Sequence, residues 1–386
     1  MAGSSAEPLP PAGLYVHVPF CRRKCPYCDF YSVPFRTEEA EHFLAALQRE
    51  MRLWAKQGPL AGTPFTTLYI GGGTPSLLTP AQLSTIFSAV DSLFRLHSGA
   101  EVTLEANPAT LSASQLCALR TVGVNRLSLG VQSLHEGELH TLGRLHTAAE
   151  AERTFRQARE AGFDNLSVDL IFGIPGQTTA SWEATLRKVI DWSPEHLSTY
   201  ALTLEPCTPM AQAVARGALR PVGTEEEKRM YLLAHDLLTA NGYEHYEISN
   251  YAKPGSRCRH NMQYWQRHPY LGLGPSAHSF HGNQRWWNVA DVSAYCQALA
   301  HDSLPVQERE VLTGEQGRLE TIMLALRTAE GLELRSLPPE SARRALEGAA
   351  RLSPDGKHPL ALLDAERIRL THYGFLVHEE VCRLLA

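Results

Sequence analysis

The chain contains few cysteines, no long uninterrupted apolar run and no excess of positive charge. Its eight cysteines in 386 residues are too sparse for the disulfide framework that stabilises small secreted domains. No apolar run approaches the roughly 20 residues that a transmembrane helix requires. The net charge of −5 gives no electrostatic support for binding bulk nucleic acid. These absences leave a reduced, cytoplasmic globular protein as the expectation.

The N-terminus also lacks basic residues. Residues 1–20 contain no Lys or Arg, and Pro8, Pro10 and Pro11 interrupt them, which excludes a secretory signal with a charged start and an apolar core. We expect residues 1–12 to be a disordered leader. The length and the 44% hydrophobic content fit one large domain with a sizeable core plus a smaller domain.

The chain does have three cysteines in one short run. Cys21, Cys25 and Cys28 follow the spacing C-x3-C-x2-C, and Tyr27 stands just before the last of them. Three thiolates on one loop can hold three irons of a [4Fe–4S] cube and leave the fourth iron open to a small chelating molecule. A structural zinc site is the alternative, but it normally has four ligands, in C-x2-C pairs or with histidines. His17 is close to the loop but falls in an apparent strand.

The first 250 residues alternate short β-branched runs with amphipathic helical patterns. Thr79-Pro80 predicts a helix start, because an N-cap residue precedes a proline at the first helical position. Gly123, Gly162 and Gly242 stand where C-cap glycines would end three helices. The expected strands cover residues 14–18, 66–70, 101–105, 126–130, 166–172 and 197–203. The expected helices cover residues 38–54, 80–94, 114–120, 150–161 and 225–240.

A strand–helix unit repeated six times implies an α/β fold with a parallel sheet and right-handed crossovers. Periodicity alone does not separate a barrel from an open doubly wound sheet. Barrel-type α/β folds place their chemistry at the C-terminal ends of the strands. Here the cysteine loop follows the first strand, and Gly71-Gly72-Gly73 follows the second.

The pattern changes after about residue 300 to a small, mostly helical module that looks like a winged helix. Its expected helices cover residues 314–327, 340–351 and 378–384, with an extended segment at 367–371. We therefore expect a barrel over residues 13–250, a connecting region over 251–303 and a C-terminal module over 304–386.

Polar residues mark the C-terminal ends of the later strands. Glu105 ends the third strand, where a carboxylate suits ribose hydroxyls. Gln132 and Arg144 follow the fourth strand, and Asp169 interrupts an apolar run. Because a buried carboxylate is unfavourable without a partner, we expect Arg144 or a ligand to bind Asp169.

Together these segments resemble the radical S-adenosylmethionine (SAM) superfamily and, within it, the HemN-like family of oxygen-independent coproporphyrinogen dehydrogenases. The resemblance rests on the cysteine loop and on residues 14–21, 71–75, 129–133 and 169–177, and it covers nearly the whole chain. It implies a partial (β/α)6 barrel with a C-terminal HemN-type module, a [4Fe–4S] cluster held by Cys21, Cys25 and Cys28, and SAM at the open iron. By resemblance, the residues lining the SAM-binding region are Tyr15, Tyr27, Gly72, Gly73, Thr74, Glu105, Gln132, Arg144, Asp169 and Ala201.

Two features resemble the heme-chaperone branch of this family (HemW). The dehydrogenase has a fourth cysteine two residues after the third, whereas Asp29-Phe30 follows Cys28 here. Residues 260–265 resemble the H-N-x-x-Y-W motif of the chaperone, in which a histidine can ligate heme iron and aromatic rings can pack on the porphyrin. The heme-contacting residues that this resemblance implies are His260, Asn261, Tyr264 and Trp265.

The resemblance thus implies a chaperone that binds heme and passes it to apo-hemoproteins, including membrane respiratory enzymes. It also leaves open a homodimer and a peripheral association with the inner face of the membrane. The alternative is a SAM-dependent oxidoreductase that decarboxylates coproporphyrinogen III to protoporphyrinogen IX. The retained SAM-site residues keep this alternative open, while the missing cysteine and the 260–265 motif argue against it.

Overall fold

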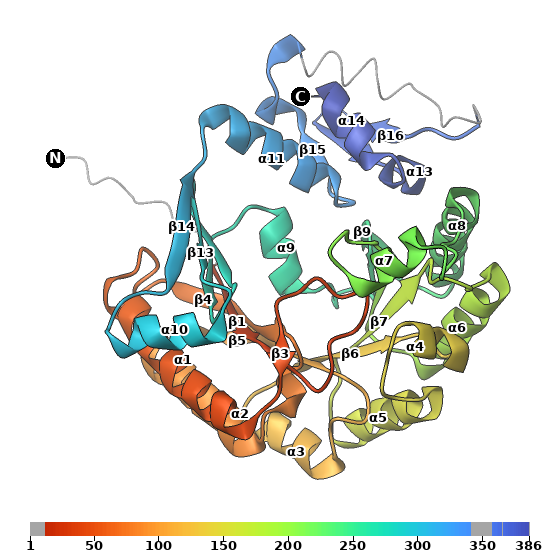
Figure 1. The fold of residues 1–386 in the computed structure, drawn as a ribbon. Helices are drawn as coiled ribbons and strands as arrows, with labels where there is room; N and C mark the ends of the chain where they lie inside the picture. The colour runs from red at the N-terminus through yellow and green to blue at the C-terminus, as the bar shows by residue number, and fades with distance from the viewer. Residues whose placement is uncertain (1–11, 341–356, 365, 386) are drawn as a thin grey trace. The chain divides into compact units, whose positions relative to one another are not determined.

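The computed structural model describes residues 12–340, 357–364 and 366–385. Figure 1 shows the course of the chain. The expected leader over residues 1–12 lies outside the described residues, except that Ala12 already begins the first strand. The helix expected at 340–351 lies outside them too, apart from its first residue.

The chain folds into two compact units, each assembled from separated stretches of sequence. The first unit combines residues Met1–Arg22, Tyr31–Leu104 and Arg259–Leu312, and the second combines Arg23–Phe30, Glu105–Cys258 and Thr313–Ala386. The first strand therefore lies in the first unit, whereas the cysteine loop that follows it is split between the two units after Arg22.

A mixed sheet forms the centre of the first unit. Four strands run parallel, in the order β11 (Tyr270–Leu273), β1 (Ala12–Val18), β4 (Pro64–Gly72) and β5 (Arg95–Ala106). Three antiparallel strands extend it beyond β11, namely β12 (His278–His281), β13 (Gln284–Asn288) and β14 (Val306–Val311). A separate short pair joins β2 (Phe20–Cys21) to β3 (Val33–Pro34). The strands expected near residues 14, 66 and 101 are confirmed as β1, β4 and β5.

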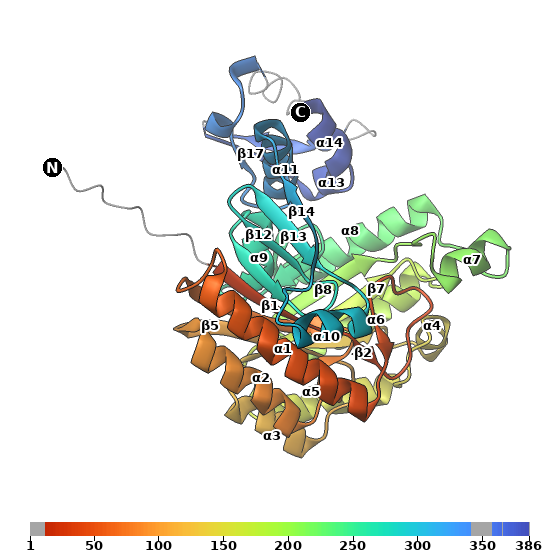
Figure 2. The same cartoon turned by 60° about the vertical axis from the view of Figure 1, so that its left-hand side comes forward.

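The helices of this unit bury the apolar stripes that their sequences predict. Helix α1 (Thr37–Gln57) packs against α2 (Pro80–Leu93) and α10 (Val292–Ala300), as Figure 2 shows. Thr79 caps α2 in a capping box with Gln82, and Pro80 occupies the first helical position, which confirms the predicted start. The short helix α9 (Arg259–Trp265) contacts β1 and β4.

The second unit has a parallel core of β6 (Arg126–Gln132), β7 (Leu166–Phe172) and β8 (His196–Ala201). Two further strands, β10 (Asn250–Ala252) and β9 (Glu244–Glu247), continue it antiparallel. Its helices are α3 (Ala113–Thr121), α4 (Glu136–Thr141), α5 (Ala148–Glu160), α6 (Thr179–Trp192), α7 (Pro209–Ala215) and α8 (Thr224–Ala240). Gly123, Gly162 and Gly242 follow α3, α5 and α8 with φ of 100°, 85° and 83°, so the predicted C-cap glycines are confirmed.

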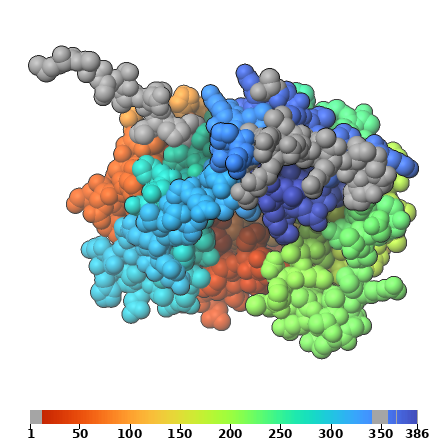
Figure 3. Space-filling view, turned by 90° about the horizontal axis from the view of Figure 1, so that it is seen from above, coloured from red at the N-terminus to blue at the C-terminus, as the bar shows by residue number. Residues whose placement is uncertain are grey.

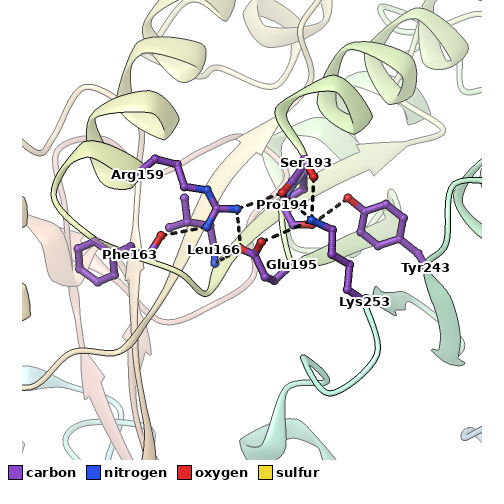
Figure 4. Close-up of polar contacts among 8 residues, drawn as sticks. All are labelled: Arg159, Phe163, Leu166, Ser193, Pro194, Glu195, Tyr243 and Lys253. Carbon is purple, nitrogen blue, oxygen red and sulfur yellow. Dashed lines mark hydrogen bonds and ion pairs between the residues drawn. The ribbon is translucent and has the colours of Figure 1, made fainter.

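A polar network ties together the segments before β8 and after β10 (Figure 4). Arg159 Nη2 lies 2.6 Å from Glu195 Oε2, and Glu195 Oε2 also accepts the Leu166 N–H at 3.0 Å. Lys253 Nζ donates to Ser193 Oγ at 2.7 Å and to its carbonyl at 2.9 Å. Because these contacts gather at the N-terminal ends of the strands, we assign them to stability rather than to chemistry.

The C-terminal part of the second unit combines helices with a small sheet. Helix α11 (Gly314–Leu326) precedes the sheet β15 (Leu332–Glu333), β17 (Arg367–Leu370) and β16 (Ala361–Leu363), and α13 (His372–Phe375) and α14 (His378–Leu385) follow it. The atoms of these last two helices are coloured darkest blue in the space-filling view of Figure 3. In the part of the chain that the structure describes, no helix is long and apolar enough to cross a bilayer.

Candidate functional site

The cysteine loop is anchored within each unit by its own contacts. Cys21, in the first unit, closes β2, and its sulfur accepts the Thr74 hydroxyl at 3.5 Å. In the second unit the Cys28 N–H bonds the Cys25 carbonyl at 3.1 Å, which closes a turn. Arg23 donates to the Gly143 carbonyl at 2.6 Å. All three cysteines are half-buried and free of disulfides.

Arg144 is the basic side chain beside the cysteine loop in the second unit. Its Nη1 donates to the Cys25 sulfur at 3.7 Å, and its Nη2 donates to the Gly130 carbonyl at 2.7 Å and to the Asn107 side-chain oxygen. Donors directed at sulfur favour thiolate over thiol, as an iron ligand requires. The donors on Cys21 and Cys25 therefore fit cysteines that hold an iron–sulfur cluster. Asn107 was missed in the sequence, because nothing in its spacing shows that it meets Arg144.

Gly72 ends β4 and Gly73 follows it, both in positions that only glycine can occupy. Gly72 has φ of 110°, and a Cβ there would lie 2.6 Å from the His17 ring. A Cβ on Gly73 would lie 2.6 Å from the Phe20 carbonyl oxygen. Both values are far inside van der Waals contact, so the close packing of His17 and Phe20 against this strand end requires glycine at both positions.

Tyr15 is held by a neutral histidine. His17 is buried, and burial lowers its pKa to about 4. Its Nε2 lies 3.0 Å from the Tyr31 carbonyl, which can only accept, so Nε2 carries the proton. Nδ1 is then the acceptor for the Tyr15 hydroxyl at 3.0 Å. This pair fixes the Tyr15 side chain at the centre of the first unit's sheet.

The remaining residues of the second unit that were predicted to line SAM include three that lie at strand ends. Glu105 and Gln132 are half-buried at the ends of β5 and β6, and Ala201 is exposed at the end of β8. Gln132 adopts a φ of 70°, which is uncommon for a residue other than glycine. Tyr27 packs against the buried cluster around Leu142, and burial raises the pKa of its phenol.

Of the two partners expected for Asp169, Arg144 is wrong, because serine hydroxyls bind the carboxylate instead. Ser128 Oγ donates to both carboxylate oxygens at 3.1 and 3.0 Å, and Ser167 Oγ lies 3.3 Å from one of them. Burial raises the pKa of Asp169, while the Arg126 charge and the serine hydroxyls oppose that rise. Arg144 is instead engaged by Cys25, Gly130 and Asn107. Hydroxyls on β6 and β7 satisfy the carboxylate, because the strand register brings them beside it.

His260 lies inside the first unit with both ring nitrogens bonded. Its Nδ1 pairs with Thr67 Oγ1 at 2.7 Å, its Nε2 pairs with the Tyr264 hydroxyl at 2.8 Å, and its ring stacks on Tyr69 with centroids 5.1 Å apart. The Glu101 carboxylate accepts the His260 N–H at 3.0 Å. The other residues of the motif, Asn261, Tyr264 and Trp265, are partly exposed.

Comparisons with known proteins identify relatives along the whole chain. A family model described as "Radical SAM superfamily" matches residues 15–189. The chain is 36% identical to "Heme chaperone HemW" of Bacillus subtilis, over 95% of this chain and 97% of that protein, and 39% identical to the protein of the same name in Escherichia coli, over 70% of each. Among solved structures, coproporphyrinogen III oxidase (HemN) from Escherichia coli matches with a TM-score of 0.83 and 25% identity, over 99% of this chain and 91% of that one.

Proposed function

The chain belongs to the radical SAM superfamily and, within it, to the family of the heme chaperone HemW, and from this we propose that it binds heme and delivers it to apo-hemoproteins. The observation that carries the proposal is the 36% identity to the Bacillus subtilis chaperone over 97% of that protein. The fold is the expected α/β fold, a partial radical-SAM barrel with a C-terminal module, because it matches the HemN structure over 99% of the chain.

Membership of the superfamily implies a [4Fe–4S] cluster and SAM. We assign Cys21, Cys25 and Cys28 as the cluster ligands, supported by the donors from Thr74 and Arg144 to two of the sulfurs. The cluster would supply an electron to bound SAM. The residues that we assign to SAM are Tyr15, Tyr27, Gly72, Gly73, Thr74, Glu105, Gln132, Arg144, Asp169 and Ala201.

The heme site is proposed around α9, in which His260, Asn261, Tyr264 and Trp265 belong to the motif. The partial exposure of Tyr264 and Trp265 supports packing of their rings on a porphyrin face. The acceptors that we propose are apo-hemoproteins, including membrane respiratory enzymes, with this protein at the inner face of the membrane as a peripheral partner and as a homodimer.

The second candidate function is oxidative decarboxylation of coproporphyrinogen III, which the HemN likeness favours. Asp29-Phe30 after Cys28 argues against it, because the chain lacks the fourth cysteine of the dehydrogenase motif. The two functions differ in what happens to the tetrapyrrole: a chaperone releases it unchanged, whereas the enzyme converts it.

The experiment is to reconstitute the cluster anaerobically and divide one preparation between two assays. Ferric heme titration followed by mixing with an apo-hemoprotein should show stoichiometric binding and transfer. Incubation with SAM, reductant and coproporphyrinogen III should leave the substrate intact, and formation of protoporphyrinogen IX would establish the enzyme instead. Cys25→Ser should abolish the iron–sulfur absorbance, whereas Cys207→Ser, an exposed cysteine outside the loop, should retain it.

A further inference from the structure

Six aromatic rings of the second unit follow one another in a row that joins α8, β9 and β10 to the C-terminal part of that unit. Neighbouring ring centroids in this row lie 4.1, 5.2, 3.9, 4.2 and 4.0 Å apart. We call these six residues the ring row, in order Tyr251, His245, His235, His372, Tyr373 and His358. Four of the six are histidines, so the charge of the row depends on pH.

The contact between His235 and His372 is the step that joins the two parts of the row. His235 lies on α8, and His372 is the first residue of α13. Their rings stack with centroids 3.9 Å apart and an interplanar angle of 14°. The Phe375 ring of α13 also meets the His245 ring of β9 edge-on at 5.3 Å. These two ring contacts therefore dock α13 on α8 and β9.

Hydrogen bonds show where the protons lie in the middle of the row. His245 Nε2 lies 3.2 Å from the Ile248 carbonyl, which can only accept, so this nitrogen carries the proton. His245 Nδ1 is then the acceptor, and His235 Nδ1 donates to it at 3.0 Å. In the neutral His235 ring the lone pair is therefore on Nε2, and a further proton would add at that atom.

The surroundings of the row disfavour protonation. Burial and the neighbouring His372 lower the pKa of His235 to about 4, whereas Asp236 opposes this change. Burial also lowers the pKa of His372, and Asp236 again opposes it. Asp236 is exposed, so water weakens its effect. The other titratable groups around the row are Tyr231, which contacts His245, Glu247, which pairs with Arg327, and His358.

We propose that the His235–His372 contact is pH-sensitive: it docks α13 on α8 and β9 while both imidazoles are neutral, and α13 separates when they are protonated. Two imidazolium rings 3.9 Å apart would repel each other, and a charged ring would gain hydration by leaving the contact. The ion pair between Arg327 and Glu247 at 2.8 Å holds the end of α11 on β9, so the separation concerns the part that carries α13. This inference is independent of the proposed heme function.

The pH dependence has a definite sign. A histidine whose pKa is lower in the docked form than its ordinary value of 6.5 favours docking fully above pH 6.5, and this contribution is lost as the pH falls from 6.5 towards 4. With the ordinary value in the separated form, His235 alone lowers the ratio of docked to separated molecules by about tenfold between pH 7.5 and 5.5. His372 acts in the same direction.

The test is hydrogen–deuterium exchange of the full chain at pH 7.5 and 5.5, with each rate corrected for the intrinsic effect of pH on exchange. In the wild type, the protection of residues 371–377 should fall by about tenfold or more at pH 5.5, while β7 keeps its protection. His372→Phe keeps a ring in the contact, and His235→Asn keeps a donor for His245 Nδ1, but neither new side chain titrates. The double variant should show equal protection of residues 371–377 at the two pH values.

His140→Asn is the matched control, because His140 is exposed on α4, and it should behave like the wild type. Each variant is compared with itself at the two pH values, so a variant that docks less well at both still gives a result. Equal protection of residues 371–377 at both pH values in the wild type, or a fall of the same size in the double variant, would overturn the inference. A parallel loss of protection in β7 would also overturn it, because the whole unit would then be unfolding.

Discussion

Glu50 is a buried carboxylate of the first unit with four donors and no cation among its hydrogen-bond partners. It accepts from the Tyr295 hydroxyl at 2.6 Å, the Asn288 amide at 2.6 Å, the Gly274 N–H at 2.8 Å and the Trp54 indole at 3.3 Å. Burial nevertheless raises its pKa to about 7 from an ordinary value of 4.5. The desolvation of the charge thus outweighs the four hydrogen bonds.

The raised pKa makes stability depend on pH with a definite sign. The folded chain holds this proton more tightly than the unfolded chain, so the contribution of Glu50 is fully present below pH 4.5 and is lost as the pH rises through about 7. The gap between these two values corresponds to about 3 kcal/mol, at about 1.36 kcal/mol per pH unit. Glu50→Gln keeps the shape and removes the titration.

The assay is denaturant unfolding under anaerobic conditions at a series of pH values from 4.5 to 8. The free energy of unfolding of the wild type should fall by about 3 kcal/mol more than that of Glu50→Gln over this range. Glu41→Gln, on the exposed side of the same helix, is the control and should follow the wild type. Parallel pH profiles for the wild type and Glu50→Gln would refute the reasoning.

Gly72→Ala should abolish SAM binding and destabilise the first unit by about 2 kcal/mol or more, because φ is 110° and the new Cβ would lie 2.6 Å from the His17 ring. Calorimetry with SAM measures the loss of binding. Gly99→Ala is the control, and it should change neither property, because its Cβ has no neighbour closer than 3.6 Å. Glu195→Ala should lower the free energy of unfolding by about 1–3 kcal/mol, because it leaves the Leu166 N–H without its acceptor and removes the ion pair of Arg159. Glu195→Gln keeps an oxygen for the N–H and should lose less, so equal losses in the two variants would contradict this account.

The alternating part of the fold was predictable from the sequence. The strands β1, β4, β5, β6, β7 and β8 follow apolar β-branched runs, and the caps at Thr79 and Gly162 mark helix ends. The parallel strand β11 and the antiparallel strands β12 to β14 were missed, because they have four to six residues each and lie in the stretch treated as a connecting region and at the start of the expected C-terminal module. Short strands stabilised by cross-strand partners carry little local signal.

Residue types in the site were predictable, but their partners were not. The cysteine and glycine spacing predicts the cysteine loop after β1 and the glycine turn at the end of β4, since both depend on local sequence. The serines beside Asp169 and the bonds that occupy His260 depend on strand register and on Thr67, almost two hundred residues away along the chain. Such contacts arise only when the elements pack.

The assembly of the first unit from separated stretches bears on the order of folding during synthesis. β1 pairs with β4 on one edge, but its other edge can pair only after β11 has been synthesised. Between Val18 and Tyr270 the ribosome needs roughly ten to fifty seconds at about 5–20 residues per second. An unpaired strand edge invites association with other chains, so nascent chains should depend on chaperone protection during this interval. Cluster insertion that requires a finished first unit would then follow translation of α10 and β14.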